Sequence, residues 1–253
     1  MKRSGIFAAV LAAVCVALSL LGGCDLTRKL QGAEVNFRKK VENAEELSFD
    51  LFLTVTDEGG TSSMDLACYM KGEEYAYVFG DPDNSGAQYR KLYADGKLYE
   101  FMAKTVLTAK TGTYYIEEGV DVSADENVLY WVRKNIMLAS YAALITAGKK
   151  ETDGDKTVYR YDFTYGGNDY SLWYDDENMT RITAVFRSTD DEGKVYTETY
   201  DAKFSNYLFA GVSAEPFKRP AELNGAYIES PVSFETWMSI MDKFGGKAGK
   251  WLE

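Results

Sequence analysis

The sequence predicts an α+β fold, in which an antiparallel meander of about ten strands is combined with helices. Three observations point to it. Apolar residues recur at every second position over most of the chain from Ser48 to Tyr207. Glycine- and aspartate-rich turns separate these runs at the short intervals typical of hairpins. One apolar segment, between Ser123 and Gly148, interrupts the alternation and has the length of a helix.

The first expected element is an amphipathic helix between Asp25 and Leu47. Its apolar residues form one loose stripe, and lysine, arginine and glutamate side chains cover the other side. Because this polar side carries both charges and the rest of the chain is acidic, we expect the helix to pack on its own domain and not on a membrane.

The alternation that follows predicts hairpins. Gly59-Gly60 and Gly72-Glu73 are the first turns, and Asp95-Gly96 is a strong two-residue hairpin signal. The strands that these turns separate are expected at 49–55, 64–70, 75–79, 88–94 and 98–102, with one more at 111–117. Cys68 lies on the apolar side of its strand, so we expect a buried and inert thiol.

The interrupting segment is predicted to be a buried helix. Ser123 and Glu126 fit a capping box, and Gly148 fits a helix stop. The second half, Ile136 to Ile145, is apolar on nearly all sides, and such a helix has to be covered on more than one face. The whole segment is too polar at its ends to span a bilayer.

Strands resume after this helix, and the last ones are long. They are expected at 159–165, 170–175, 181–188 and 194–207. Pro216 and Pro220 then open a coil, and Ser233 is expected to cap a final short helix that runs to Phe244. Since no repeat or low-complexity linker divides the chain, we expect one domain.

Composition excludes several classes of function. The chain has 253 residues, a net charge of −11 and no histidine. The acidic charge argues against nucleic acid as a partner, because phosphates need a basic surface. The absence of histidine removes the commonest general base and metal ligand. Three cysteines are present, Cys15, Cys24 and Cys68, but the first two fall in or at the end of the N-terminal apolar segment, so we expect no intrachain disulfide.

No motif indicates catalysis or a metal. Asp81 to Gly86 resembles the start of a calcium loop, but Leu92 stands where a bidentate glutamate is required. The acidic clusters at 117–118, 175–177 and 190–192 each fall at a turn, and neighbouring strand residues point to opposite faces. A glycosidase pair formed over long range stays open. We therefore expect a protein that is not an enzyme, with no catalytic residue, no cofactor and no metal.

The N-terminus has the pattern of an export signal. Lys2 and Arg3 precede an uncharged run, and Leu21-Gly22-Gly23-Cys24 resembles a bacterial lipobox. The resemblance implies cleavage after Gly23 and a lipid on Cys24, which would attach the protein to the extracytoplasmic face of the cell membrane. The expected organisation is a signal peptide at 1–23, an anchor segment with the first helix at 24–47, and one domain at 48–253. An uncleaved membrane helix and a secreted soluble protein are the alternatives.

Several segments resemble the LolA/LolB-like superfamily of lipoprotein-localisation factors and lipid-carrier lipoproteins. They are the hairpin Tyr93–Tyr99, the strand pair Tyr170–Tyr174 and Arg181–Phe186, and Asn206-Tyr207 followed by Phe217 and Pro220. The resemblance implies a strongly curved, incomplete β-barrel with helices packed on its concave side and an acyl-chain cavity between them.

The predicted binding residues are apolar and lie on the strands and the helix that would enclose such a cavity. They are Leu51, Leu53, Met64, Leu66, Met70, Ile136, Leu138 and Leu144. Three hypotheses follow. The protein is a non-enzymatic carrier or sensor of a lipid or other apolar ligand, a structural lipoprotein that interacts with another envelope protein and has a filled core, or a glycan-binding module that uses surface aromatics.

Overall fold

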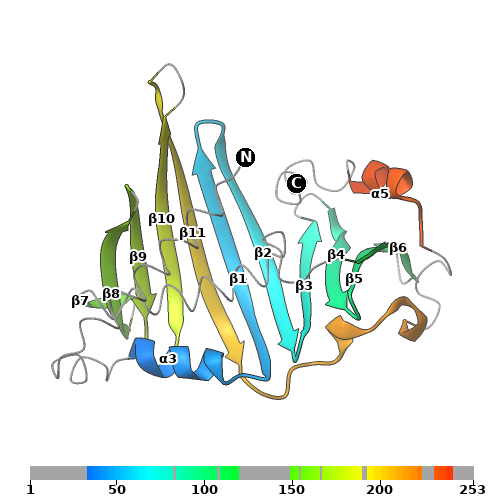
Figure 1. Ribbon diagram of the computed structural model, residues 1–253, viewed down its shortest axis with the longest axis horizontal. Helices are drawn as coiled ribbons and strands as arrows, with labels where there is room; N and C mark the ends of the chain where they lie inside the picture. Colours follow the sequence, from blue (N-terminus) through cyan, green and yellow to red (C-terminus); the bar gives the residue numbers. More distant parts are fainter. Residues whose placement is uncertain are drawn as a thin grey trace.

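The computed structural model describes residues 33–81, 84–106, 109–119, 149–153, 155–165, 167–189, 193–223 and 231–241. These residues form one antiparallel sheet of eleven strands with two α-helices, α3 (Ala33–Glu42) and α5 (Phe234–Met241), and two 3-10 turns, η1 (Glu215–Phe217) and η2 (Pro220–Glu222) (Figure 1). The strands are β1 (Glu46–Asp57), β2 (Gly60–Lys71), β3 (Glu74–Asp81), β4 (Asn84–Ala94), β5 (Lys97–Val106), β6 (Ala109–Glu118), β7 (Lys149–Asp153), β8 (Lys156–Tyr165), β9 (Asn168–Tyr174), β10 (Met179–Thr189) and β11 (Val195–Leu208).

The sheet is curved and open, with β6 at one edge and β7 at the other. Its order is β6-β5-β4-β3-β2-β1-β11-β10-β9-β8-β7, so two meanders meet where β11 pairs with β1. This confirms the predicted fold class, an incomplete antiparallel barrel with helices on its concave side. The strand β7 was not predicted, because its five residues, Lys-Lys-Glu-Thr-Asp, are all polar and lack the alternation that marks the others.

The core lies on the concave face, where the period-two alternation places the apolar residues. Leu51 of β1 stands opposite Leu66 of β2, and Phe49 stands opposite Cys68. The helix α3 packs on this face through Phe37 and Val41, which are fully buried. The ring of Phe37 lies edge-on to three aromatic rings from β9, β11 and the segment after it, those of Tyr174, Tyr207 and Phe209.

The helix α3 ends at Glu42, so the expectation that the helix continues to Leu47 is wrong. The side chain of Asn43 donates to the carbonyl oxygen of Lys39 over 2.8 Å, which satisfies a backbone group that the next helical turn would have used. Leu47 belongs to β1 and pairs with Met70. It is the first member of the alternating series, and burial on the sheet outweighs continuation of the helix.

The segment after β11 is packed against the convex face of β3 to β5. The prolines predicted a coil, but Phe217 is buried in a second core cluster with Phe101 and Leu92. The guanidinium of Arg90 donates to the carbonyl oxygens of Glu215 and Lys218, both over 3.0 Å, and lies over the ring of Phe101. This half of the sheet is therefore covered on both faces.

The final helix is capped as predicted. Ser233 Oγ accepts a hydrogen bond from the backbone N–H of Thr236, which is the N-cap pattern, and α5 runs from Phe234 to Met241. Phe244, where the helix was expected to end, lies outside the described residues. Trp237 of this helix is buried. Among the described residues, neither helix has the length and hydrophobicity needed to cross a bilayer.

Candidate functional site

Five of the eight predicted binding residues lie together on the concave face. Leu51 and Leu53 of β1 stand opposite Leu66 and Met64 of β2, and Met70 follows on the same side of β2. Leu51, Leu66 and Met70 are buried, while Leu53 and Met64 are half-buried. Leu53 and Met64 thus form a half-buried pair on this face, and Val55, the next residue of β1 on the same side, is buried again. We name these five residues the apolar strip.

The other predicted sites lie outside the described residues. These are Cys24 with the whole lipobox, the helix from Ser123 to Gly148, and its residues Ile136, Leu138 and Leu144. Their roles stay predictions.

The concave face continues from the apolar strip into β3, β4 and β5, and there it contains an ion pair that is largely covered. Lys91 of β4 stands opposite Glu100 of β5, and Nζ of the lysine lies 3.2 Å from Oε1 of the glutamate. The side chains keep only 13% and 12% of their full exposure. The hydroxyl of Tyr89 donates to the same Glu100 oxygen. Because charged groups are rarely buried without partners, this pair is the most unusual polar feature of the face.

Aromatic side chains surround the pair. Tyr77 stands opposite Lys91 on β3, and Tyr115 stands opposite Glu100 on β6. The ring of Trp237 stacks on Tyr115 at a centroid distance of 6.2 Å and lies 6.3 Å from the ring of Tyr89. Burial raises the pKa of Tyr77 and of Tyr89 well above the usual value, and that of Tyr93 to about 12. These phenols are therefore hydrogen-bond donors at neutral pH.

Sequence reasoning missed this pair although the signal was present. A two-residue turn at Asp95-Gly96 fixes the register of the hairpin, and that register pairs Lys91 with Glu100. Both turn residues have the positive φ of a type I′ turn, 56° and 70°. Lys91 lies between Tyr89 and Tyr93 on the apolar side of its strand. Once the turn had been recognised, the sequence therefore predicted a charged residue on the apolar face.

Two further polar groups lie on the concave face. Cys68 is fully buried, as predicted, and burial raises the pKa of its thiol far above the ordinary value, which keeps it protonated and unreactive. The hydroxyl of Tyr207, whose ring packs on Phe37 of α3, is buried and has no hydrogen-bond partner in the part of the chain that the structure describes. Among the described residues, no three histidine, cysteine, aspartate or glutamate side chains gather to hold a metal ion.

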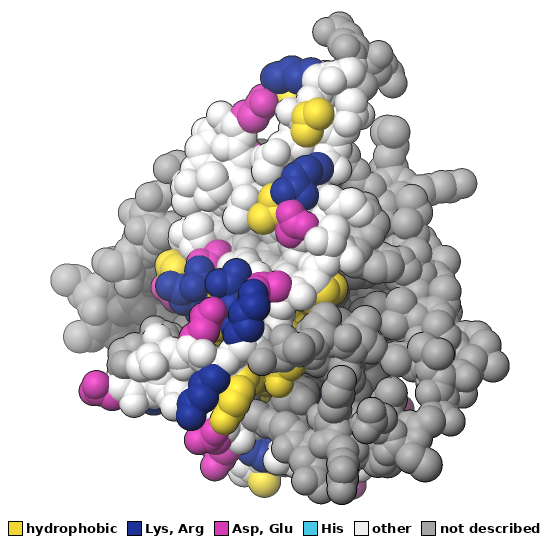
Figure 2. Space-filling view, turned by 90° about the vertical axis from the view of Figure 1, so that its left-hand side faces the viewer, with side chains coloured by type: hydrophobic (Ala, Val, Ile, Leu, Met, Phe, Trp, Pro, Cys, Tyr) yellow, Lys and Arg dark blue, Asp and Glu magenta, His cyan; other side chains and the backbone are white. Residues whose placement is uncertain are grey.

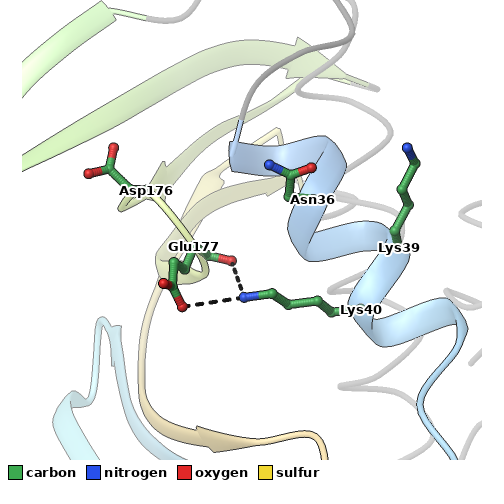
Figure 3. A pocket seen from close by; sticks show the side chains of 5 residues that line it. All are labelled: Asn36, Lys39, Lys40, Asp176 and Glu177. Atoms are coloured by element: carbon green, nitrogen blue, oxygen red, sulfur yellow. Dashed lines mark hydrogen bonds and ion pairs between the residues drawn. The ribbon is translucent and has the colours of Figure 1, made fainter.

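A surface hollow lies between α3 and the turn that joins β9 to β10 (Figure 3). Its lining is polar, and Nζ of Lys40 reaches across it to a carboxylate oxygen of Glu177 at 3.4 Å. The lining residues are Asn36, Lys39, Lys40, Asp176 and Glu177. The hollow therefore differs in character from the apolar site predicted from the sequence.

The convex face of β7 to β11 carries charges that are exposed and paired. Trp173 of β9 lies between the guanidinium groups of Arg160 and Arg181, at 5.1 and 4.8 Å from the ring centre. Arg181 makes two hydrogen bonds to Asp201, each 2.8 Å long. Figure 2 looks onto the β7 side of the molecule and shows basic and acidic side chains next to one another. The guanidinium groups of Arg160, Arg181 and Arg187 each have an acidic partner in the sheet itself.

No protein-family model matches the chain. A search of curated proteins also finds no match.

Similar solved structures are remote. The lipoprotein LppX of Mycobacterium tuberculosis has 10% identity and a TM-score of 0.36 over 72% of this chain and 96% of that one. A domain assigned to outer membrane lipoprotein sorting in Vibrio parahaemolyticus has 10% identity and a TM-score of 0.29, covering 75% of this chain and 97% of that one. A DUF1329 family protein of Desulfovibrio piger has 12% identity and a TM-score of 0.26, covering 75% and 96%. These similarities are too weak to support an argument, so the fold of this chain follows only from its own strand pairing.

Proposed function

We propose that the protein is a lipid-anchored, non-enzymatic protein of the cell envelope that binds a lipid or another apolar ligand on the concave face of its sheet. The apolar strip is the observation that supports this proposal most directly. Leucine and methionine side chains from two strands meet there, and two of them, Leu53 and Met64, are half-buried. An open sheet cannot pack its concave face on itself, and methionine adapts to ligands of varied shape.

Native mass spectrometry of the purified full-length protein tests this function. We expect a bound lipid mass in addition to the mass of the chain. Met64→Lys places a charge in the apolar strip and should strongly reduce the bound lipid. Ser63→Lys is the matched control, because Ser63 is the neighbouring residue on the exposed side of the same strand. A parent protein that carries no lipid and binds no apolar probe would favour the structural, protein-interaction alternative.

The proposed anchor rests on the sequence from Leu21 to Cys24. A single buried acyl chain holds a protein only weakly, so a diacylglyceryl group on Cys24 would supply the second chain that stable attachment needs. Cys24→Ala should leave an unprocessed chain without lipid, which intact-mass measurement detects. If the parent and the variant carried the same added mass and were retained equally on membranes, the assignment of Cys24 as the lipidated residue would be wrong.

The absence of enzymatic activity is part of the same proposal. The chain has no histidine, and Glu100, the buried carboxylate of the concave face, is bound by Lys91 and Tyr89. A panel of generic esterase, phosphatase and glycosidase substrates should give background rates. Turnover that disappears when one acidic residue is replaced would contradict this part of the proposal.

A further inference from the structure

The Lys91–Glu100 pair shares the concave face with the apolar strip. Cys68, next to Leu66 on the strip side of β2, stands opposite Tyr77 of β3, and Tyr77 stands opposite Lys91. Neighbouring strands are about 4.8 Å apart, so the pair begins about 10 Å from the strip across the sheet. A ligand whose chain lies on the strip therefore has a charged pair within reach of its end.

The pair has unused hydrogen-bonding capacity. A lysine ammonium has three N–H donors, and among the described residues Nζ of Lys91 contacts one partner, Glu100 Oε1. The same oxygen accepts from Tyr89, so within the described residues the second carboxylate oxygen is left available as an acceptor. Both side chains keep a small exposed fraction, so a ligand can approach them. A donor and an acceptor are thus offered side by side.

We propose that Lys91 and Glu100 bind the head group of the ligand and that this head group is uncharged and carries hydroxyls, as in a monoacylglycerol. This rests on the proposed function, namely that an apolar chain occupies the same face. A hydroxyl accepts from Lys91 and donates to Glu100 at the same time. A phosphate or carboxylate would be attracted to Lys91 but repelled by the Glu100 carboxylate. An ammonium would be attracted to Glu100 but repelled by the ammonium of Lys91. Since the pair is neutral overall, a charged head would bring an unpaired charge into a buried site.

The aromatic surroundings suit this assignment. Trp237 and Tyr115 place stacked rings beside the pair, and the Tyr77 ring borders it on the strip side. Rings of this kind exclude water and strengthen hydrogen bonds that form next to them. The raised pKa of Tyr89 keeps its hydroxyl protonated, so that it continues to donate to Glu100 while a ligand is bound.

The test compares three probes that share one acyl chain. Monoolein has free hydroxyls, methyl oleate has none, and oleate is charged. Each is titrated against the full-length protein by displacement of a fluorescent apolar dye. Two added hydrogen bonds of about 1 kcal/mol each would give monoolein at least a tenfold lower Kd than methyl oleate. Equal binding of the two, or tightest binding of oleate, would overturn the head-group assignment and leave the proposed function intact. If none of the three binds, the proposed function itself fails.

A double variant identifies the residues. Lys91→Met with Glu100→Leu replaces a buried ion pair by apolar side chains of similar size, an exchange that proteins often tolerate. It should bind methyl oleate as the parent does and lose the preference for monoolein. The matched control is Arg181→Met with Asp201→Leu on the convex face. This control should keep the preference for monoolein. A preference that survives in the first variant would contradict the role of the pair. Should that variant fail to fold, the ranking of probes on the parent still decides the assignment.

Discussion

Two ion pairs in this protein join neighbouring strands on opposite faces of the sheet. Lys91–Glu100 joins β4 to β5 on the concave face, where the side chains keep 13% and 12% of their exposure. Arg181–Asp201 joins β10 to β11 on the convex face, with 40% and 26% exposed. A contact between opposite charges is worth little in water, whereas inside a protein it offsets a large desolvation penalty. We therefore expect the two pairs to differ in energy far more than in distance.

The largest expected effect is the loss of one partner from the buried pair. Glu100→Ala removes the carboxylate that the ammonium of Lys91 and the hydroxyl of Tyr89 both contact, and it should lower the free energy of unfolding by about 3–5 kcal/mol. Urea denaturation measures it. Glu117→Ala is the control, because Glu117 is exposed near the end of β6. A loss below about 1 kcal/mol for Glu100→Ala would show that water reaches the pair freely.

A smaller effect is expected where the concave face is apolar. Cys68→Ser puts a hydroxyl between Phe49 and Tyr77, which stand opposite Cys68 on the two neighbouring strands, and should cost about 1–3 kcal/mol because a hydroxyl is more costly to bury than a thiol. The thiol of the parent should not react with a thiol reagent at pH 8, since burial raises its pKa far above that value. Mass mapping of the labelled peptide checks this, and rapid labelling of native protein would contradict the burial.

The Arg181–Asp201 pair on the convex face should contribute less to stability than the Lys91–Glu100 pair. Arg181→Met keeps most of the aliphatic contact with Trp173 and removes the two hydrogen bonds to Asp201. We expect a loss of at most about 1 kcal/mol in urea denaturation, reduced further by salt. If Arg181→Met lowered the free energy of unfolding as much as Glu100→Ala does, the difference in solvent exposure would not explain the energies of the two ion pairs.

The smallest effect concerns acid pH on the convex face. Partial burial opposes ionisation of Asp162, but hydrogen bonds from Ser171, Arg160 and Lys149 outweigh it and hold the pKa below the ordinary value. The stabilisation is therefore present above the unfolded pKa of about 3.9 and is lost as the pH falls through the folded pKa. The difference in melting temperature between parent and Asp162→Asn should narrow between pH 6 and pH 3. A constant difference would contradict the lowered pKa.

Local features were predictable from the sequence, and long-range ones were not. The alternation in β1 and β2 placed Leu51, Leu66 and Cys68 on the correct face, and Asp95-Gly96 located its hairpin. The packing of Phe217 on the convex face had no local signal, because prolines around it are equally compatible with an exposed coil. Nothing in the sequence around Arg90 indicated that its guanidinium would donate hydrogen bonds to backbone carbonyl oxygens more than a hundred positions away.

The candidate site divides in the same way. The five residues of the apolar strip follow from period-two alternation and from the turn at Gly59-Gly60, and their register is confirmed. The Lys91–Glu100 pair was within reach of the same reasoning through its turn, yet its burial depends on Trp237 of α5 and on neighbouring strands. Burial of this kind is a property of the assembled fold and cannot be read from one hairpin.

The pairing of β1 with β11 sets the order in which this protein can be completed. Asp50 and Asn206, which hydrogen-bond across that pair, are separated by 156 positions, whereas the other neighbouring strands of the sheet are consecutive along the chain. Hairpins close in microseconds, but contacts between distant segments need costly loop closure. During synthesis β1 therefore emerges early and keeps one unpaired edge until β11 arrives. That interval is the time when the chain is most open to wrong strand pairing or to a chaperone.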